Sequence, residues 1–351
     1  MSSTSSANPQ TAASSQHDWA LLRQTLPFRR ANAWLSAWQV VSTLMLAVAT
    51  LALVARYPSW WLQLLLVLPM GGLLIRLFVL QHDCGHGSLF NQRSINQFVG
   101  HLLAAVTTVP FKLWAAEHHW HHQNQGKLEH RGVDMMNSPM TLQEAHANPR
   151  GRRYREDKIS VRNIFAIGAW SLLAERKFSK DFFMFRKAFR WPVPQERALR
   201  RSIVIANVSS LLVHGAILWW IGWVAYLTFM LPASFIGAGC GSLLFWIQHN
   251  FEETYYAPVT EWQYNKVGTQ GSSYLRLPPL LAWFTAHIGL HHVHHLNASI
   301  PNYRLEEARL GIAELTAVQP MTHAQYRGCF SKLFWDARTS RLSSYRVDDA
   351  A

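Results

Sequence analysis

Long apolar runs alternate with polar stretches along this chain of 351 residues. The runs cover about residues 33–55, 60–80, 202–225 and 231–248, and Arg76 is the one charged residue that interrupts them. Each run is close to the ~20 residues that an α-helix needs to cross a bilayer. The pattern therefore predicts an all-α integral membrane protein with four transmembrane helices.

A fifth apolar run, at about residues 98–114, is shorter and contains His101 and Pro110. If this run crossed the membrane, the histidine-rich stretches before and after it would lie on opposite faces of the bilayer. We therefore expect a short re-entrant or interfacial segment here rather than a further crossing.

Polar segments lie outside these runs. Residues 1–30 are predicted to be a disordered polar tail, and residues 1–18 lack the Lys and Arg of a signal peptide. Residues 31–310 are the predicted membrane-embedded domain. Residues 311–351 are predicted to be a charged cytosolic region, so both termini are expected in the cytoplasm.

Residues 115–201 predict a cytosolic helical cap. Counted along the sequence, the stretch from Lys112 to Arg201 holds 18 of the 33 Lys and Arg residues, which indicates the cytoplasmic side. Within it, apolar residues recur at helical spacing at 164–173 and 178–189. They are consistent with amphipathic helices on the membrane surface and also with a soluble helical insert.

Composition narrows the class of partner. The net charge of +13 suits nucleic acid or an anionic lipid surface, and the apolar runs favour lipid. No motif of interleaved basic and aromatic residues indicates nucleic acid. The three cysteines, Cys84, Cys240 and Cys329, lie far apart, which argues against a disulfide framework or a thiolate metal site. Cys84 is predicted to be a small buried residue.

Histidines in the polar stretches repeat a fixed spacing. Residues three and four apart share one face of a helix, so histidines at that spacing point the same way. The motif H-x-x-H-H is expected only ~0.05 times by chance in a chain with 18 His, yet it occurs twice. An exposed solubilising histidine tract is the less favoured explanation. The motifs contain His82 and His86; His118, His121 and His122; and His291, His294 and His295.

The predicted topology brings these motifs to one cytosolic rim, where His249 also follows the fourth apolar run. Eight or nine neutral imidazoles exceed the four ligands of a zinc site, so they indicate two metal ions with open positions. Nitrogen ligation is compatible with Zn, Cu, Fe or Ni. We therefore expect a histidine-rich dimetal site.

Residues beside the motifs are weaker candidates. Asp83 and Glu117 adjoin predicted ligands, where a carboxylate can hold the second imidazole N–H, although plain solvated charges explain them equally well. Asp134 receives no role. His214, inside the third run, is predicted to hydrogen-bond between helices. The other histidines near the motifs are predicted to be neighbours rather than ligands: His119, His130, His287 and His292.

The motifs HDCGH, HHWHH and HHVHH around four apolar runs resemble those of the membrane-bound fatty acid desaturases. The resemblance covers about residues 35–310. Other short sequence motifs are similar to those of the bacterial acyl-lipid branch of this family. They lie at residues 82–90, 246–252, 270–273 and 288–303.

The resemblance implies a set of iron ligands. In animal acyl-CoA relatives, an Asn four residues before the ninth histidine also takes part, and here that position is Phe245, which leaves a tenth ligand unassigned. The implied ligands are His82, His86, His118, His121, His122, His249, His291, His294 and His295.

The resemblance also implies the reaction: oxygen-dependent removal of two hydrogens from adjacent methylenes of a membrane lipid acyl chain, at two iron ions, giving a cis double bond. The chain has no His-Pro-Gly-Gly stretch of a fused cytochrome b5 and no cysteine set for an iron–sulfur cluster. Electrons are therefore expected from an external ferredoxin-like carrier, and the bacterial branch implies the inner membrane.

Two other functions stay open. Lipid hydroxylases and carotenoid ketolases of the same superfamily use similar histidine motifs to insert oxygen. A membrane protein that binds metal or haem for electron transfer is the non-enzymatic alternative. Analysis of the product and a search for the absorption band of haem separate these cases.

Overall fold

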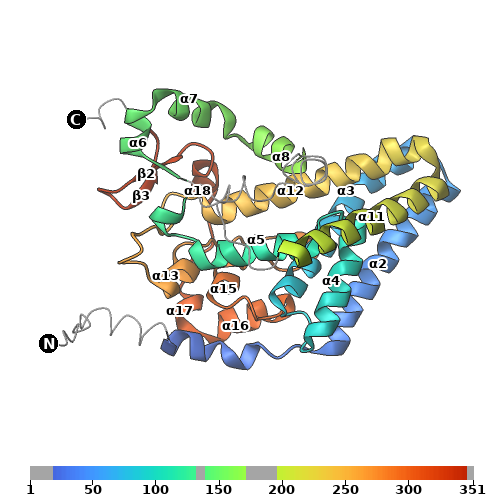
Figure 1. The fold of residues 1–351 in the computed structure, drawn as a ribbon, viewed down its shortest axis with the longest axis horizontal. Coiled ribbons are helices and arrows are strands. Elements are labelled where there is room, and N and C mark those ends of the chain that lie inside the picture. Colours follow the sequence, from blue (N-terminus) through green and yellow to red (C-terminus); the bar gives the residue numbers. More distant parts are fainter. Residues whose placement is uncertain (1–18, 132–138, 171–195, 346–351) are drawn as a thin grey trace.

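The computed structural model describes residues 19–131, 139–170 and 196–345, and most of them are helical (Figure 1). The helices are η1 (Leu26–Phe28), α2 (Ala33–Arg56), α3 (Trp60–His86), α4 (Arg93–Thr107), α5 (Phe111–Asn124), η2 (Leu128–His130), α6 (Leu142–Ala147), α7 (Pro149–Lys158), α8 (Val161–Trp170), α11 (Glu196–Ala225), the π-helix η5 (Tyr226–Met230), α12 (Leu231–His249), α13 (Tyr264–Thr269), α14 (Pro279–Phe284), α15 (His291–Leu296), η6 (Asn302–Arg304), α16 (Leu305–Gly311), α17 (Ala313–Thr316) and α18 (His323–Gly328).

The prediction of an all-α chain missed one small sheet. Its strands are β1 (Met140–Thr141), β2 (Phe334–Asp336) and β3 (Arg341–Ser343). β1 pairs in parallel with β2, and β2 pairs antiparallel with β3. Strands of two or three residues are too short to show a period of two in the sequence, so hydrophobic patterning gave no signal for them.

Three helical stretches are long and apolar enough to cross a membrane: Ala33–Arg56, Trp60–His86 and Ala198–His249. The last covers both the third and the fourth predicted runs. Gly222 interrupts it with φ 81° and ψ 158°, and α11 and α12 then run in opposite directions (Figure 1). The molecule thus has three candidate membrane helices, or four if the bent pair α4 and α5 is counted as one span.

Helices α4 and α5 meet at an angle of 104°, which is the geometry of a broken span or a re-entrant loop. The bend at Thr108 leaves backbone carbonyls without helical partners, and such groups need other donors inside a membrane protein. His214 supplies one: its Nε2 lies 3.0 Å from the Val106 oxygen, and its Nδ1 lies 2.9 Å from the Tyr226 hydroxyl. Gln81 Nε2 donates to the Val109 oxygen at 3.0 Å. His214 therefore bonds between helices, as predicted.

Arg76, the charge inside the second apolar run, is buried in α3 with 4% of its surface exposed. Its guanidinium donates to Gln39 Oε1 at 3.0 Å, to Thr43 Oγ1 at 3.1 Å and to the Trp283 carbonyl. It also lies over the Trp283 ring, 4.3 Å from the centroid. Neutral acceptors thus satisfy the guanidinium and tie α2 and α3 to the segment that holds α14.

Part of the N-terminal tail that was predicted to be disordered is folded. Residues 19–24 are helical, Leu21 is 2% exposed, and Thr25 is fully buried. Leu21 packs in one cluster with Leu305 and Ala308 of α16, and Asn297 Nδ2 donates to Thr25 Oγ1 at 2.7 Å. The segment at residues 19–25 has too few apolar residues to show a helical periodicity in the sequence. Its structure depends on packing against distant residues. Residues 1–18 lie outside the described part.

The polar segments pack onto the last membrane helix. Phe165 of α8 lies against Gly239 of α12, so residues 161–170 cover a helix rather than lie apart from the bundle. The C-terminal residues join the same face, where Trp246 Nε1 donates to the Cys329 oxygen at 2.9 Å. The predicted amphipathic segment 178–189 and Asp134 lie outside the described residues.

Candidate metal centre

Four helix segments bring the nine predicted histidine ligands together. The last turn of α3 carries His82 and His86, and it ends at Gly87, whose φ of 73° is a left-handed conformation that favours glycine. The C-terminus of α12 supplies His249. The other two segments carry the H-x-x-H-H motifs: α5 holds His118, His121 and His122, and α15 holds His291, His294 and His295.

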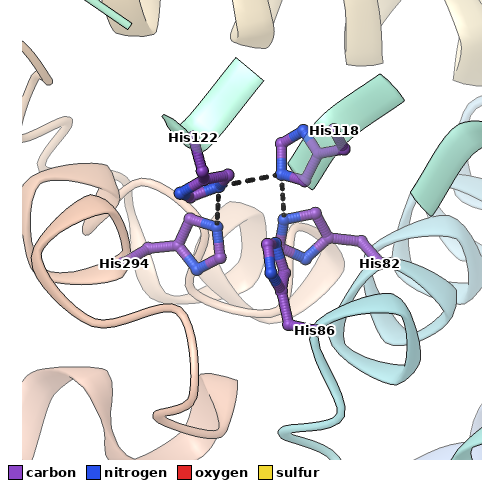
Figure 2. Close-up of side chains that lie close together, drawn as sticks. All are labelled: His82, His86, His118, His122 and His294. Carbon is purple, nitrogen blue, oxygen red and sulfur yellow. Dashed lines mark hydrogen bonds between the residues drawn. The ribbon is translucent and has the colours of Figure 1, made fainter. Parts of the chain in front are cut away.

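The side chains form two adjoining groups. Each group's ligand nitrogens lie within 4.8 Å of one another. Group A is His82, His86, His118, His122 and His294 (Figure 2). Group B is His121, His249 and His295, and we add His291 to it because its Nε2 lies 2.9 Å from His249 Nε2. The groups touch where the His122 and His295 rings stack, with centroids 4.0 Å apart.

The nitrogen spacing fits a shared ion better than a chain of hydrogen bonds. His118 Nε2 lies 3.0 Å from both His82 Nε2 and His122 Nε2. A neutral ring nitrogen has one lone pair or one hydrogen, so His118 Nε2 can satisfy one of these contacts at most. Two ligands bound at right angles with metal–nitrogen bonds of about 2.1 Å would lie about 3.0 Å apart. His249 repeats this arrangement with His121 and His291.

Burial favours the neutral form of the three α15 histidines, which is the state that ligates a metal. Loss of solvent is the largest effect, and neighbouring histidines add to it, so the pKa values of His291, His294 and His295 lie well below their usual range. His86 Nε2 and both ring nitrogens of His295 are buried without a hydrogen-bond partner among the described residues. Such orphaned nitrogens fit a metal, which would use their lone pairs.

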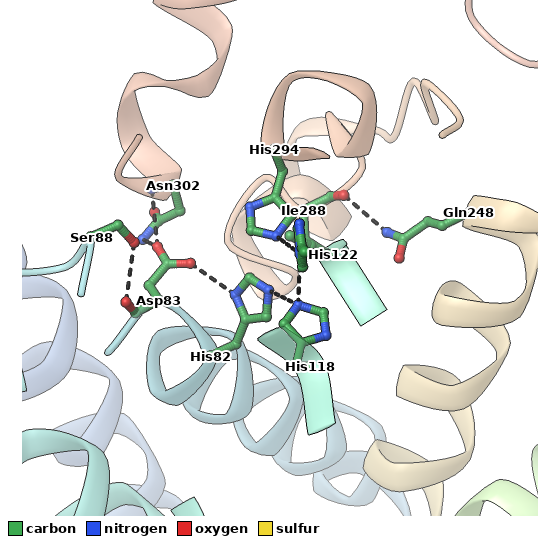
Figure 3. A network of polar contacts seen from close by, with 9 residues as sticks. All are labelled: His82, Asp83, Ser88, His118, His122, Gln248, Ile288, His294 and Asn302. Carbon is green, nitrogen blue, oxygen red and sulfur yellow. Dashed lines mark hydrogen bonds and ion pairs between the residues drawn. The ribbon is translucent and has the colours of Figure 1, made fainter. Parts of the chain in front are cut away.

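Asp83 supports group A through His82. His82 Nδ1 donates to Asp83 Oδ1 at 3.0 Å, which directs the Nε2 lone pair toward the group (Figure 3). The other carboxylate oxygen accepts from the backbone N of Asn302 at 3.0 Å and from its Nδ2 at 2.9 Å. In metal sites, a carboxylate often holds the second ring N–H of an imidazole ligand, and the contact of Asp83 with His82 has this geometry. Glu117 is partly buried beside His118 on α5.

Group B has a backbone carbonyl in the equivalent place. His249 Nδ1 donates to the Gly271 oxygen at 3.1 Å, so its Nε2 faces His121 and His291. The segment around Gly271 is held to α12, because the Ser273 N donates to the Gln248 oxygen at 2.9 Å. Gln248 Nε2 in turn donates to the Ile288 oxygen at 2.9 Å, just before α15 (Figure 3).

Phe245 lies between the two groups. Its ring centroid is 5.0 Å from that of His121 and 5.7 Å from that of His118. A benzyl ring has no ligand atom, so this position supplies no tenth ligand. On the other side, Trp114 stacks on His118 with centroids 4.4 Å apart. Aromatic rings therefore form apolar walls beside the imidazoles.

The predicted neighbours stay outside the two groups. His119, His130 and His287 have exposed side chains. His292 is fully buried on the other side of α15 beside Tyr274, and burial lowers its pKa to about 3. Cys84 is buried, as predicted. The sequence did not predict that Asn302 contacts Asp83 or that the Gly271 carbonyl contacts His249. Both residues lie in the motifs that resemble those of the bacterial acyl-lipid desaturases.

An apolar cavity lies on the bundle side of the groups, between α3, α12 and the bend that joins α4 to α5. Phe78 of α3 lines it one turn before His82. Gly241 of α12 lines it one turn before Phe245. Residues 106–109 close a third side. The cavity, of about 40 Å³, therefore lies on the same helices, α3 and α12, that carry histidines of groups A and B closer to their C-terminal ends.

Comparisons of the whole sequence agree with this arrangement. A family model described as fatty acid desaturase matches residues 58–327. A fatty acid desaturase of Bacillus subtilis is 30% identical over 335 residues, which cover 93% of this chain and 90% of that protein. The sn-1 oleoyl-lipid 12-desaturase of Synechocystis is 26% identical over 79% of this chain and 76% of its own length. The sn-1 acyl-lipid omega-3 desaturase (ferredoxin) of that organism is 25% identical over 81% and 77%.

Proposed function

The chain belongs to the fatty acid desaturase family, and on that premise we propose that it introduces a cis double bond into an acyl chain of a membrane lipid. The proposed centre is a pair of non-haem iron ions held by the histidines of groups A and B. Dioxygen is the proposed co-substrate, and a reduced ferredoxin or a similar carrier is the proposed electron donor.

One observation carries the proposal: buried imidazole nitrogens converge in two adjoining groups beside an apolar cavity. Nitrogen ligation alone allows several metals. Iron is chosen because this reaction needs a redox metal: bound iron accepts electrons and activates dioxygen to break strong C–H bonds. The proposed ligands are the five histidines of group A and the four of group B. Asp83 and the Gly271 carbonyl hold His82 and His249 in the tautomer whose Nε2 carries a lone pair for a metal ion.

The apolar cavity is the proposed place of part of the acyl chain. It has a volume of about 40 Å³ and mostly hydrocarbon walls, so it offers room for a short stretch of methylenes rather than for the whole chain. Phe78 lines the cavity and packs on Trp114, which stacks on His118, and Phe245 packs on His121. Their rings keep water away from the position where hydrogens are removed.

We place the metal groups at the cytoplasmic face of the bacterial inner membrane, with four crossings and both termini inside. The arginines of α7 give that face a positive surface, since Arg150, Arg152 and Arg153 lie on one short helix. A positive surface favours encounter with an acidic electron carrier. The word ferredoxin in a relative's name agrees with this choice of donor.

The test is the fatty acid profile of a bacterium that expresses the full chain with a ferredoxin system. Methyl esters are separated by gas chromatography and identified by mass spectrometry, beside a His121→Ala control. A new unsaturated ester that appears only with the intact chain supports the proposal and locates the bond. A hydroxylated or oxo product, or an unchanged profile from protein that contains iron, contradicts desaturation.

The proposed acyl site has its own test at Gly241. A Cβ at Gly241 would meet no atom within 4 Å, so Gly241→Leu puts a side chain into the cavity without a backbone clash. Gly215 of α11 is equally open but lies on the outside of the bundle, so Gly215→Leu is the matched control. We expect Gly241→Leu to lower desaturation by about tenfold and to leave the iron content unchanged. Equal activities of the two variants would contradict the acyl site.

A further inference from the structure

A second cavity, of about 390 Å³, lies between α4, α5 and the start of α11. It is within the ~300–1,000 Å³ of small-molecule sites. We call it the basic pocket, and its lining is His101, Lys112, Ala198, Arg201, Ser202 and Ile205. None of these residues belongs to group A or group B.

The charge of the basic pocket is unbalanced. Lys112 and Arg201 are both cations at neutral pH, and no lining residue is acidic. Among the described residues, no carboxylate forms an ion pair with either of them. Two like charges that face one cavity repel each other unless an anion lies between them. The pocket is therefore complementary to an anion.

The position of the pocket indicates a lipid. Arg201 lies at the point where α11 changes from charged to apolar, because no charged residue follows between Ser202 and Ala225. Lys112 lies in the first turn of α5, directly after the bend of the apolar pair. Cations at such a boundary meet the phosphate layer of the membrane. Ile205, 42% exposed, extends the lining toward the apolar side.

We propose that the basic pocket binds the phosphate group of a membrane phospholipid. The guanidinium of Arg201 can hold two phosphate oxygens at once, and the Lys112 ammonium adds a second charge. Ser202 Oγ accepts from the Lys112 backbone N at 3.3 Å, so its hydroxyl hydrogen is free to donate to the phosphate. The glycerol and acyl chains of the lipid extend over Ile205.

Binding is measured by microscale thermophoresis on the full chain in a neutral detergent. The titrants are dioctanoyl phosphatidylglycerol, dioctanoylglycerol, which has the same tails without phosphate, and inorganic phosphate. We expect the phospholipid to bind and dioctanoylglycerol to bind at least about tenfold more weakly. Inorganic phosphate is also expected to bind more weakly, because it lacks the apolar contacts.

The variants test the two cations. Arg201→Gln and Lys112→Gln should each raise the Kd for the phospholipid about tenfold. Arg200→Gln is the matched control, because this neighbour has the same charge and does not line the pocket. It should change the Kd by less than about twofold. Both pocket side chains are at least partly exposed, so the variants are expected to fold, and their thermal melting verifies this.

Three results would overturn the proposal. The first is equal phospholipid affinity in the wild type and in both pocket variants. The second is equal affinity for dioctanoylglycerol, which would mean that only tails bind. The third is inorganic phosphate binding as tightly as the phospholipid, which would assign the pocket to a free anion. The assay needs neither iron nor electrons, so its result is independent of the desaturase proposal.

Discussion

Groups A and B hold their histidines by different means. In group A a buried carboxylate, Asp83, accepts from His82, and Asn302 fixes that carboxylate. In group B a neutral carbonyl, Gly271, accepts from His249. A carboxylate raises the basicity of the imidazole that it holds more than a carbonyl does. We therefore expect the two groups to bind their ions with different strength, group A more tightly.

The largest expected effect is the loss of a ligand from either group. His118→Ala and His121→Ala should each lower desaturation by at least about 100-fold, because each removes one proposed nitrogen ligand, from group A and from group B respectively. The measurement is the amount of unsaturated ester per milligram of protein. His119→Ala is the matched control in the same helix, since its side chain is exposed. Full activity in either ligand variant would contradict the assignment of that group.

Asp83→Asn tests the difference between the groups. An amide has one acceptor oxygen, so it can accept from His82 or from Asn302 but not from both, as the two oxygens of Asp83 do. We expect the affinity of group A for iron to fall about 10–100-fold, while that of group B stays constant. The measurement is the iron that remains on the chain during titration with a ferrous chelator. An equal loss from both groups would show that the carboxylate does not distinguish them.

Asn302→Ala should have a smaller effect of the same kind. The substitution removes the donor Nδ2, while the backbone N of residue 302 still donates to Asp83. We expect the iron affinity of group A to decrease about threefold to tenfold. The same titration with a ferrous chelator measures this decrease. A larger loss than in Asp83→Asn would mean that Asn302 acts by another route.

Phe245→Leu should have the smallest effect and should act on both groups alike. The leucine keeps an apolar side chain between His118 and His121, although it fills less space than the ring. We expect iron affinity to change by less than about threefold in each group. A selective loss from one group would mean that Phe245 belongs to that group alone.

The sequence predicted the parts of the molecule whose physical signal is local. Runs of about 20 apolar residues indicated α2 and α3 directly, and the spacing of His118, His121 and His122 indicated one helix face. The helix that carries the second predicted run, at about 60–80, continues past that run to His86. The last turn of α3 is polar in sequence, yet most of it is buried among the histidines of the site. The family was also predicted and is confirmed.

Other features depend on contacts between distant residues and left no local signal. Asn302 lies 219 positions from Asp83, and no spacing rule connects them. The same holds for Leu21, whose burial against α16 turned a predicted tail into structure. The division of nine histidines into two groups needs the relative position of α3, α5, α12 and α15, which only the tertiary structure supplies.

The number of metal ions is measured as the iron content of purified full-length protein, by plasma mass spectrometry after anaerobic loading with ferrous iron. We expect about two iron ions per chain in the wild type and in His119→Ala. We expect about one in His118→Ala, because group A loses its ion, and about one in His121→Ala, because group B loses its ion. A single ion per wild-type chain, or two ions kept in both ligand variants, would contradict a diiron centre built from groups A and B.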